Sequence, residues 1–175
     1  GYDSASNSLV TFPVLTVIDV NEMMQAIITG LSISPYIRQL SDSRLQVSGG
    51  ELQKLGDYFY LAGGHNFTGT YTRTINNQVY TDKIQKFKII DNGISISLSD
   101  YSAWTDTVEF HRRDMNLVPA IKPDGVTPFM ILYGGVFKRN ADLPFLNPIN
   151  IDENGPSVDY SFEQKMSQYT CSYLS

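Results

Sequence analysis

The sequence predicts an all-β protein built from four-stranded antiparallel blades, and three observations support this prediction. A β-rich unit with several strand candidates occurs twice, over residues 44–104 and 105–165. The second strand candidate of each copy ends in a diglycine, Gly63-Gly64 or Gly134-Gly135. Between apolar or β-branched runs, Gly follows Asp or Asn, which is typical of tight hairpin turns. Repetition of such a unit indicates a β-propeller.

The strand candidates have the residue patterns that blades require. Residues 94–99 alternate apolar and polar side chains, as expected of a strand with one buried face. Residues 58–62 and 129–133 are apolar almost throughout, which is typical of strands buried on both faces. Glycine weakens a strand unless something requires a missing side chain. At both diglycines we therefore expect close approach of neighbouring blades, or a backbone conformation open only to Gly.

The remaining segments do not complete a closed propeller. Residues 1–43 are predicted to hold a flexible lead and the last strands of a preceding blade, at residues 15–20 and 25–29. Residues 166–175 are predicted to hold the first strand of a following blade. Propellers close with about four to eight blades, and an open one leaves strand edges unpaired. We therefore expect an incomplete propeller, whose open edges are covered by the remaining blades or by another chain.

The first copy resembles a kelch repeat in three features. It has Gly63-Gly64 after the second strand, Tyr80 ahead of the third strand and Trp104 near the end of the repeat. The second copy keeps Gly134-Gly135 but has no Trp and a divergent third strand, so it is a degenerate kelch-like blade. The resemblance implies a kelch-like β-propeller fold.

A narrower resemblance bears on location. Residues 59–67, 111–119 and 142–146 are similar to a group of secreted kelch-like proteins from Bacteroidetes-type bacteria. The similarity covers most of the chain from about Leu45 onward, and it implies a secreted or cell-surface protein. That group has no settled activity, so the resemblance implies fold and location rather than function.

Composition argues against several functional classes. The net charge is −5, and acids and bases are interspersed without a basic stripe, which argues against nucleic acid as a partner. No segment approaches the length of a transmembrane helix. Cys171 is the single cysteine, and two histidines supply at most a pair of metal ligands. With no phosphate loop or nucleophile elbow, we predict no catalytic residue, no metal site and no cofactor.

Blade topology predicts one face on which functional side chains gather. The loop entering the first strand of a blade and the loop joining its second and third strands emerge on the same side. Residues 65–79, 111–114 and 136–143 should therefore converge. Cations near aromatic rings in these loops suit an anionic or sugar-like ligand. The candidate ligand-binding residues are His65, Arg73, His111, Arg112, Arg113, Asp114 and Arg139.

A structural role competes with ligand binding at these residues. For residues 111–114 the favoured interpretation is an ion-paired corner that pins one blade to the next, because structural ion pairs are common. His65 directly follows a diglycine and is predicted to be a hydrogen-bonded anchor rather than a catalytic base.

Two classes of function remain open. The first is a non-enzymatic recognition scaffold that binds protein or glycan through the loop face. The alternative is a carbohydrate-active or copper-oxidase-like enzyme whose site is completed by blades outside this segment. Paired carboxylates would favour a glycosidase. The acids of the loop face are scattered at Asp82, Asp114 and Asp142, so the scaffold is preferred.

Overall fold

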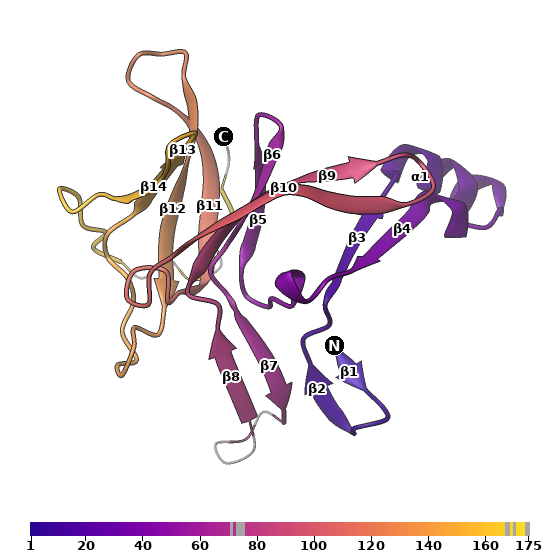
Figure 1. The fold of residues 1–175 in the computed structure, drawn as a ribbon, viewed down its shortest axis with the longest axis horizontal. Helices are drawn as coiled ribbons and strands as arrows, with labels where there is room; N and C mark the ends of the chain where they lie inside the picture. Colours follow the sequence, from indigo (N-terminus) through magenta and orange to yellow (C-terminus); the bar gives the residue numbers. More distant parts are fainter. Residues whose placement is uncertain (71, 73–75, 167–168, 170, 174–175) are drawn as a thin grey trace.

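The computed structural model describes residues 1–70, 72, 76–166, 169 and 171–173, and within them antiparallel strands dominate. The described strands form three four-stranded sheets and one two-stranded sheet (Figure 1). The all-β prediction is therefore confirmed. No helix in these ranges is long and apolar enough to cross a membrane.

Two of the sheets are four-stranded meanders that fall within the two predicted copies. The central sheet contains β5 (Glu51–Leu55), β6 (Tyr58–Ala62), β9 (Lys83–Asp91) and β10 (Ile96–Thr105). The C-terminal sheet contains β11 (Arg113–Ile121), β12 (Pro128–Val136), β13 (Ile149–Asp152) and β14 (Gly155–Val158). Each of these two segments thus contains one four-stranded antiparallel sheet, and β10 ends one residue beyond the first predicted copy.

The insertion between β6 and β9 differs from the expected loop. Residues 65–80 form a hairpin of β7 (His65–Gly69) and β8 (Asn76–Tyr80). The N-terminal hairpin of β1 (Tyr2–Asp3) and β2 (Ser8–Val10) extends it, in the order β1-β2-β7-β8. Thr11 holds the junction, because its hydroxyl accepts the Phe67 N–H and its N–H donates to the Phe67 carbonyl, both at 2.9 Å. The first ten residues are therefore tied into a sheet rather than forming a flexible lead.

The segment before the central sheet is part strand and part helix. β3 (Val14–Ile18) pairs with β4 (Ile37–Ser41), and α1 (Val20–Thr29) and the short 3₁₀ helix η1 (Ser34–Tyr36) connect them. A second 3₁₀ helix, η2 (Ser43–Leu45), leads into the central sheet.

The prediction of a strand at residues 25–29 is wrong, because local signals favour a helix there. Asp19 caps the helix by accepting the Glu22 N–H at 3.3 Å, and Gly30 ends it at a φ of 70°. The predicted strand within residues 166–175 is also absent from the described part of that segment, at residues 166, 169 and 171–173. Its other positions lie outside the described residues.

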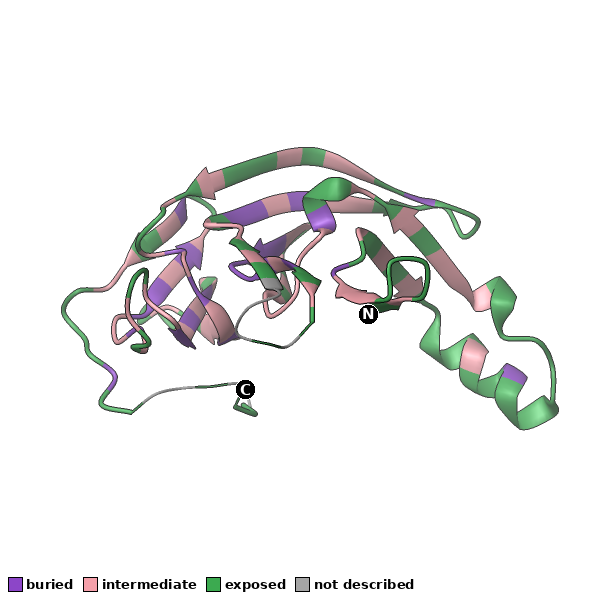
Figure 2. Cartoon of the chain, turned by 90° about the horizontal axis from the view of Figure 1, so that it is seen from below, coloured by how far each residue is buried: buried purple, intermediate pink, exposed green. Residues whose placement is uncertain are grey.

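The hydrophobic core lies on both faces of the central sheet. On one face Tyr60, Ala62 and Ile84 pack against buried residues of the C-terminal sheet, among them Leu117 and Ile149. On the opposite face Leu61 and Phe87 pack with side chains of β3 and β4. Figure 2 shows that the buried positions concentrate in these layers, whereas α1 is largely exposed.

The two strands expected to be buried on both faces behave differently. β6 meets the expectation, since Tyr60 and Leu61 point to opposite faces and are 2% and 9% exposed. β12 does not, because Met130 and Leu132 are buried while Phe129, Ile131 and Tyr133 on the opposite face are half-buried. The outer face of the C-terminal sheet therefore presents apolar side chains that no further sheet covers in the described structure.

The glycine predictions are confirmed at both diglycines. Gly63 has a φ of 59°, and a Cβ there would lie 2.6 Å from the Arg112 carbonyl oxygen and would also contact the Met115 methyl group. Gly135 has a φ of 88°, and a Cβ there would lie 2.9 Å from the Arg112 Cβ. Both positions combine a left-handed backbone with a close approach to Arg112.

Gly63→Ala should lower the free energy of unfolding by about 2 kcal/mol or more, because it adds both backbone strain and a steric overlap. Gly93→Ala is the matched control, since Gly93 has a φ of 83° but a Cβ there would meet nothing within 4 Å. It should cost about 1 kcal/mol from the left-handed conformation alone. Urea denaturation measures both variants. Equal losses would show that the close approach at Gly63 has no energetic consequence.

Candidate functional site

The three segments predicted to converge do meet at one end of the two meanders. The Gly64 N–H donates to the Arg112 carbonyl at 2.7 Å, which joins the central sheet to the segment before β11. The Arg113 guanidinium lies over the Phe137 ring at 4.5 Å, which joins that segment to the loop after β12. The convergence that blade topology predicts is therefore observed for the described residues of these segments.

Arg112 is the most buried member of this group, with no side-chain exposure. Its guanidinium donates to the carbonyls of Glu109 at 2.6 Å, Gly134 at 3.1 Å and Asn147 at 2.9 Å. It also donates to the Glu109 carboxylate at 3.0 Å and stacks on the Phe145 ring at 4.3 Å. Burial lowers the pKa of Arg112 to about 10, against the opposing effect of Glu109, so the side chain stays charged at neutral pH.

These contacts assign Arg112 to the framework. Arg112 is ion-paired with Glu109 and enclosed by protein rather than facing a ligand. Unlike the predicted corner between two blades, its side-chain partners all lie within the second copy, and only its backbone carbonyl bonds to the first, at Gly64.

His111 and Arg139 belong to a second cluster that is centred on Asp82. The His111 Nδ1 lies 2.6 Å from one Asp82 oxygen, and the Arg139 guanidinium donates to the other oxygen at 2.8 Å. The Tyr80 ring stacks on His111 with 3.9 Å between the ring centroids. Arg139 also donates to the Thr107 carbonyl at 3.1 Å. The cluster fastens the loop after β12 to the turn between β8 and β9.

The remaining described candidates, His65, Arg113 and Asp114, line one cavity of about 350 Å³. His65 opens β7, and Arg113 and Asp114 open β11. The other side chains that carry polar or aromatic groups into this wall are Thr11, Ser48, Phe67 and Tyr169. Arg73, also a candidate, lies outside the described residues.

The electrostatics of this cavity combine a neutral imidazole with an ion pair. Burial lowers the pKa of His65 below its usual value, and the Arg113 cation acts in the same direction against Asp114. The Nδ1 atom of His65 is buried and has no hydrogen-bond partner among the described residues, so His65 is not the predicted hydrogen-bonded anchor through this atom. The Arg113 Nε lies 3.4 Å from the Asp114 carboxylate but is not aligned for a hydrogen bond.

This arrangement suits recognition of a polar ligand. The wall offers a cation, a carboxylate and the hydroxyl groups of Thr11, Ser48 and Tyr169 next to the rings of His65 and Phe67. Such a combination of a few fixed polar groups with apolar surface is typical of ligand sites. Within the described ranges, no three His, Cys, Asp or Glu side chains are grouped to hold a metal ion.

Sequence reasoning missed part of this wall. Thr11 and Ser48 lie far from His65 in the chain and carry no motif. Their hydroxyl oxygens lie 3.2 Å apart in the structure, and an isolated bridge between Ser48 and His65 brings them to β7. The pairing of β2 with β7 places Thr11 at the cavity, and the bridge to His65 places Ser48 there. No local sequence pattern predicts either pairing.

No family model matches the chain, and neither the curated proteins nor the solved structures contain a match. The kelch resemblance and the secreted or cell-surface location therefore stay predictions.

Arg112→Ala should lower the free energy of unfolding by about 3–5 kcal/mol, because it removes a buried charge and leaves the Glu109 carboxylate without its cation. Arg139→Ala is the control, since its side chain is 49% exposed and the loss should be at most about 1 kcal/mol. Thermal and urea unfolding measure both. Similar small losses for the two variants would contradict the framework role of Arg112.

His65→Gln should flatten the pH dependence of stability. Because the pKa of His65 is lower in the folded chain, the unfolded chain binds the proton more readily. Stability should therefore be fully present above pH 6.5 and fall as the pH decreases below that value. The wild type should lose more stability than His65→Gln between about pH 7 and pH 5. Parallel curves for the two proteins would rule out this role for His65.

Proposed function

We propose that the protein is a non-enzymatic recognition scaffold, a segment of a kelch-like β-propeller, that binds a protein or glycan ligand. The observation that carries this proposal is the cavity in which Arg113 and Asp114 meet His65 and Phe67. Binding residues commonly sit at the ends of strands on a rigid scaffold. A secreted or cell-surface location is part of the proposal and rests on the resemblance alone.

The arrangement of the two meanders favours the propeller interpretation. The central and C-terminal sheets pack face to face through one hydrophobic cluster, and their first strands, β5 and β11, lie side by side. Neighbouring propeller blades are expected to pack in this way. β3 and β4 occupy the corresponding place on the other face of the central sheet.

Exposed apolar surfaces at both ends of the stack favour further partners, either the remaining blades or another chain. At one end, α1 and the residue after its C-cap present an apolar stripe with the spacing of one helix face. Each of its members is more than half exposed: Val20, Met24, Ile27, Ile28 and Leu31. At the other end lies the outer face of the C-terminal sheet. Exposed apolar patches of this kind mark interaction surfaces.

The ligand chemistry follows from the cavity wall. Arg113 can donate two parallel hydrogen bonds to a carboxylate or to paired hydroxyl groups. Asp114 can accept hydrogen bonds from hydroxyl or amide groups. The rings of His65 and Phe67 are 6.3 Å apart in an edge arrangement and supply apolar surface beside these polar groups. A sugar ring or a polar peptide side chain offers this mixture.

A binding screen on a glycan array and a peptide array tests the proposal with variants that keep the fold. Arg113→Ala and Asp114→Asn should each weaken binding by about tenfold or more, because charged hydrogen bonds are each worth about 1.5–3 kcal/mol. Asn tolerates the φ of 56° at position 114. Raising the salt concentration should weaken wild-type binding as well.

Arg139→Ala is the control, since Arg139 lies on the same face but does not line the cavity. It should leave affinity unchanged. The proposal would be contradicted if the folded wild type bound nothing on either array. It would also be contradicted if all variants bound with the affinity of the wild type.

A further inference from the structure

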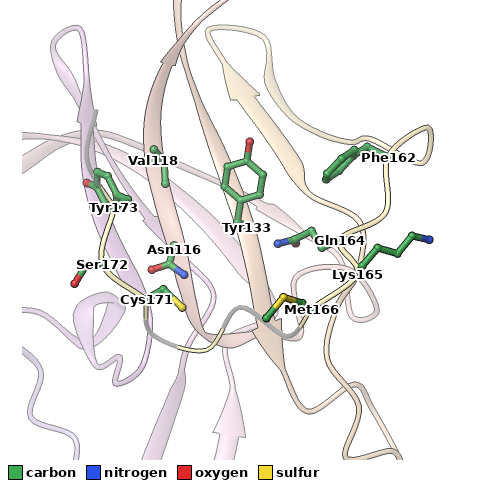
Figure 3. A pocket seen from close by; sticks show the side chains of 10 residues that line it. All are labelled: Asn116, Val118, Tyr133, Phe162, Gln164, Lys165, Met166, Cys171, Ser172 and Tyr173. Atoms are coloured by element: carbon green, nitrogen blue, oxygen red, sulfur yellow. The ribbon is translucent and has the colours of Figure 1, made fainter.

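Two cavities differ in whether their walls contain buried atoms without a partner. The larger one, of about 490 Å³, lies between β11, β12 and the segment after β14, and Figure 3 shows the side chains that line it. None of these side chains carries a buried nitrogen or oxygen that lacks a hydrogen-bond partner within the described residues. Two such atoms, His65 Nδ1 and Arg113 Nε, belong to side chains that line the cavity at His65. Because buried polar atoms are nearly always paired, this cavity is the better candidate for a specific ligand.

Arg113 differs from its neighbour Arg112 in how its Nε atom is satisfied. The Arg112 Nε donates to the Glu109 carbonyl at 2.6 Å. The Arg113 Nε is also buried, but it has no hydrogen-bond partner in the described part of the chain. It lies 3.4 Å from the Asp114 carboxylate without the alignment that a hydrogen bond needs. A largely buried cation is costly unless its donors are bonded, so Arg113 has unused capacity for an acceptor.

The Asp114 carboxylate lies beside space that a glycine leaves open. The backbone of Asp114 is left-handed, with a φ of 56°, and its N–H donates to the Gly49 carbonyl at 2.8 Å. A Cβ at Gly49 would lie 3.0 Å from the Asp114 Oδ1, and both residues line the cavity. Left-handed residues other than glycine cluster at ligand sites, where the surrounding structure holds them in place. The missing side chain at Gly49 therefore keeps this oxygen uncrowded at the cavity.

The charges of the wall restrict the chemistry of the ligand. Arg113 and Asp114 are the charged side chains of the cavity, and burial lowers the pKa of His65, which keeps its imidazole neutral at pH 7. A simple carboxylate would pair with Arg113, but the neighbouring Asp114 would repel it. A ligand that also carries a hydroxyl group close to its carboxylate turns Asp114 into a partner, because the hydroxyl donates to it. The wall therefore favours a hydroxylated acid.

The other groups of the wall favour a sugar ring as the carrier of these groups. The hydroxyl oxygens of Thr11 and Ser48 lie 3.2 Å apart, and a β-bridge joins Ser48 to His65. They can bond to further hydroxyl groups of a ligand. The rings of His65 and Phe67 add apolar surface for the C–H groups of a sugar. An acidic side chain of a peptide carries its carboxylate on an aliphatic stem and has no hydroxyl for Asp114.

We propose that the cavity at His65 binds an acidic sugar, the terminal uronic acid residue of a glycan. Its carboxylate accepts hydrogen bonds from the Arg113 guanidinium, and its 4-hydroxyl donates to Asp114. Its other hydroxyl groups face Ser48 and Thr11. This inference rests on the proposed recognition function and deepens it by naming the class of ligand.

Three small probes test the ligand class: methyl glucuronoside, methyl glucoside and N-acetylglutamate α-amide. The glucoside replaces the carboxylate of the glucuronoside by a neutral hydroxymethyl group, and the glutamate derivative keeps a carboxylate without the hydroxyls. NMR titration of the full chain measures the three dissociation constants. The wild type should bind the glucuronoside about tenfold more tightly than either other probe, because charge-assisted hydrogen bonds are the stronger ones.

Asp114→Asn should change the affinities for the two acidic probes in opposite directions. It removes the charged acceptor for the sugar hydroxyl, so the affinity for the glucuronoside should fall about tenfold. It also removes the charge that repels a simple carboxylate, so the affinity for the glutamate derivative should rise. Arg139→Ala is the control, since Arg139 does not line the cavity, and it should leave both affinities unchanged. The NMR spectrum of each variant shows whether it is folded.

The inference is overturned if the glucuronoside binds no better than the glucoside, or if Asp114→Asn shifts both acidic probes in the same direction. Preferential binding of the glutamate derivative would overturn it in favour of an acidic peptide. In each of these cases, binding on the glycan or peptide array would leave the proposed recognition function standing. A folded wild type that binds none of the probes and nothing on the arrays would contradict both.

Discussion

The fold depends most on the buried guanidinium of Arg112. Its side chain donates to the carbonyl of Gly134 in β12 and to the carbonyl of Asn147 in the loop before β13. Its backbone carbonyl accepts the Gly64 N–H of the central unit. One glycine of each pair leaves room for this residue, because a Cβ at Gly63 or Gly135 would collide with Arg112 or with Met115, which packs beside it. A charge without solvent contact is costly unless its donors are satisfied. Here the Glu109 carboxylate and the backbone oxygens of Glu109, Gly134 and Asn147 satisfy them. The guanidinium thus holds Arg112 against the C-terminal unit, and the backbone carbonyl of Arg112 bonds to the Gly64 N–H of the central unit. This hydrogen bond joins the two units in addition to the hydrophobic cluster between their sheets.

This junction also explains how the candidate sites are divided. Arg112 and Arg113 are adjacent in sequence, yet one is enclosed between the sheets and the other lies over Phe137 at the cavity with Asp114. The cluster of His111, Asp82 and Arg139 fixes the neighbouring loops. The outer face of the C-terminal sheet is left with Phe129, Ile131 and Tyr133 half-buried. The surfaces that we propose for recognition thus lie where the stacking of sheets ends.

Strands and turns that depend on local residue patterns could be predicted from the sequence. Elements that depend on pairing between distant segments could not. Turns such as Asn92-Gly93 and the alternation of residues 94–99 located β9 and β10, because hairpins form between neighbouring segments. The polar residues 65–79 gave no strand signal, since β7 is stabilised by β2 from the far end of the chain. Asp19, Glu22 and Gly30 are local signals for the ends of α1, whereas the β-branched pair Ile27-Ile28 favours a strand and leads to the wrong prediction. The convergence of the loop segments followed from topology, whereas the burial of Arg112 and the path of Gln164 across the sheet follow only from tertiary packing.

Hydrogen–deuterium exchange of Arg112→Lys tests the central role of this junction most directly. Lysine keeps the positive charge but cannot reproduce the planar set of donors that reaches several carbonyls at once. Exchange should accelerate at the Gly64 and Phe145 amides, which bond to Arg112 and to Gly135 on the two sides of the junction. The amides at the far turn, such as Gly93, should exchange as in the wild type. Unchanged exchange at Gly64 and Phe145 in the folded variant would contradict the account.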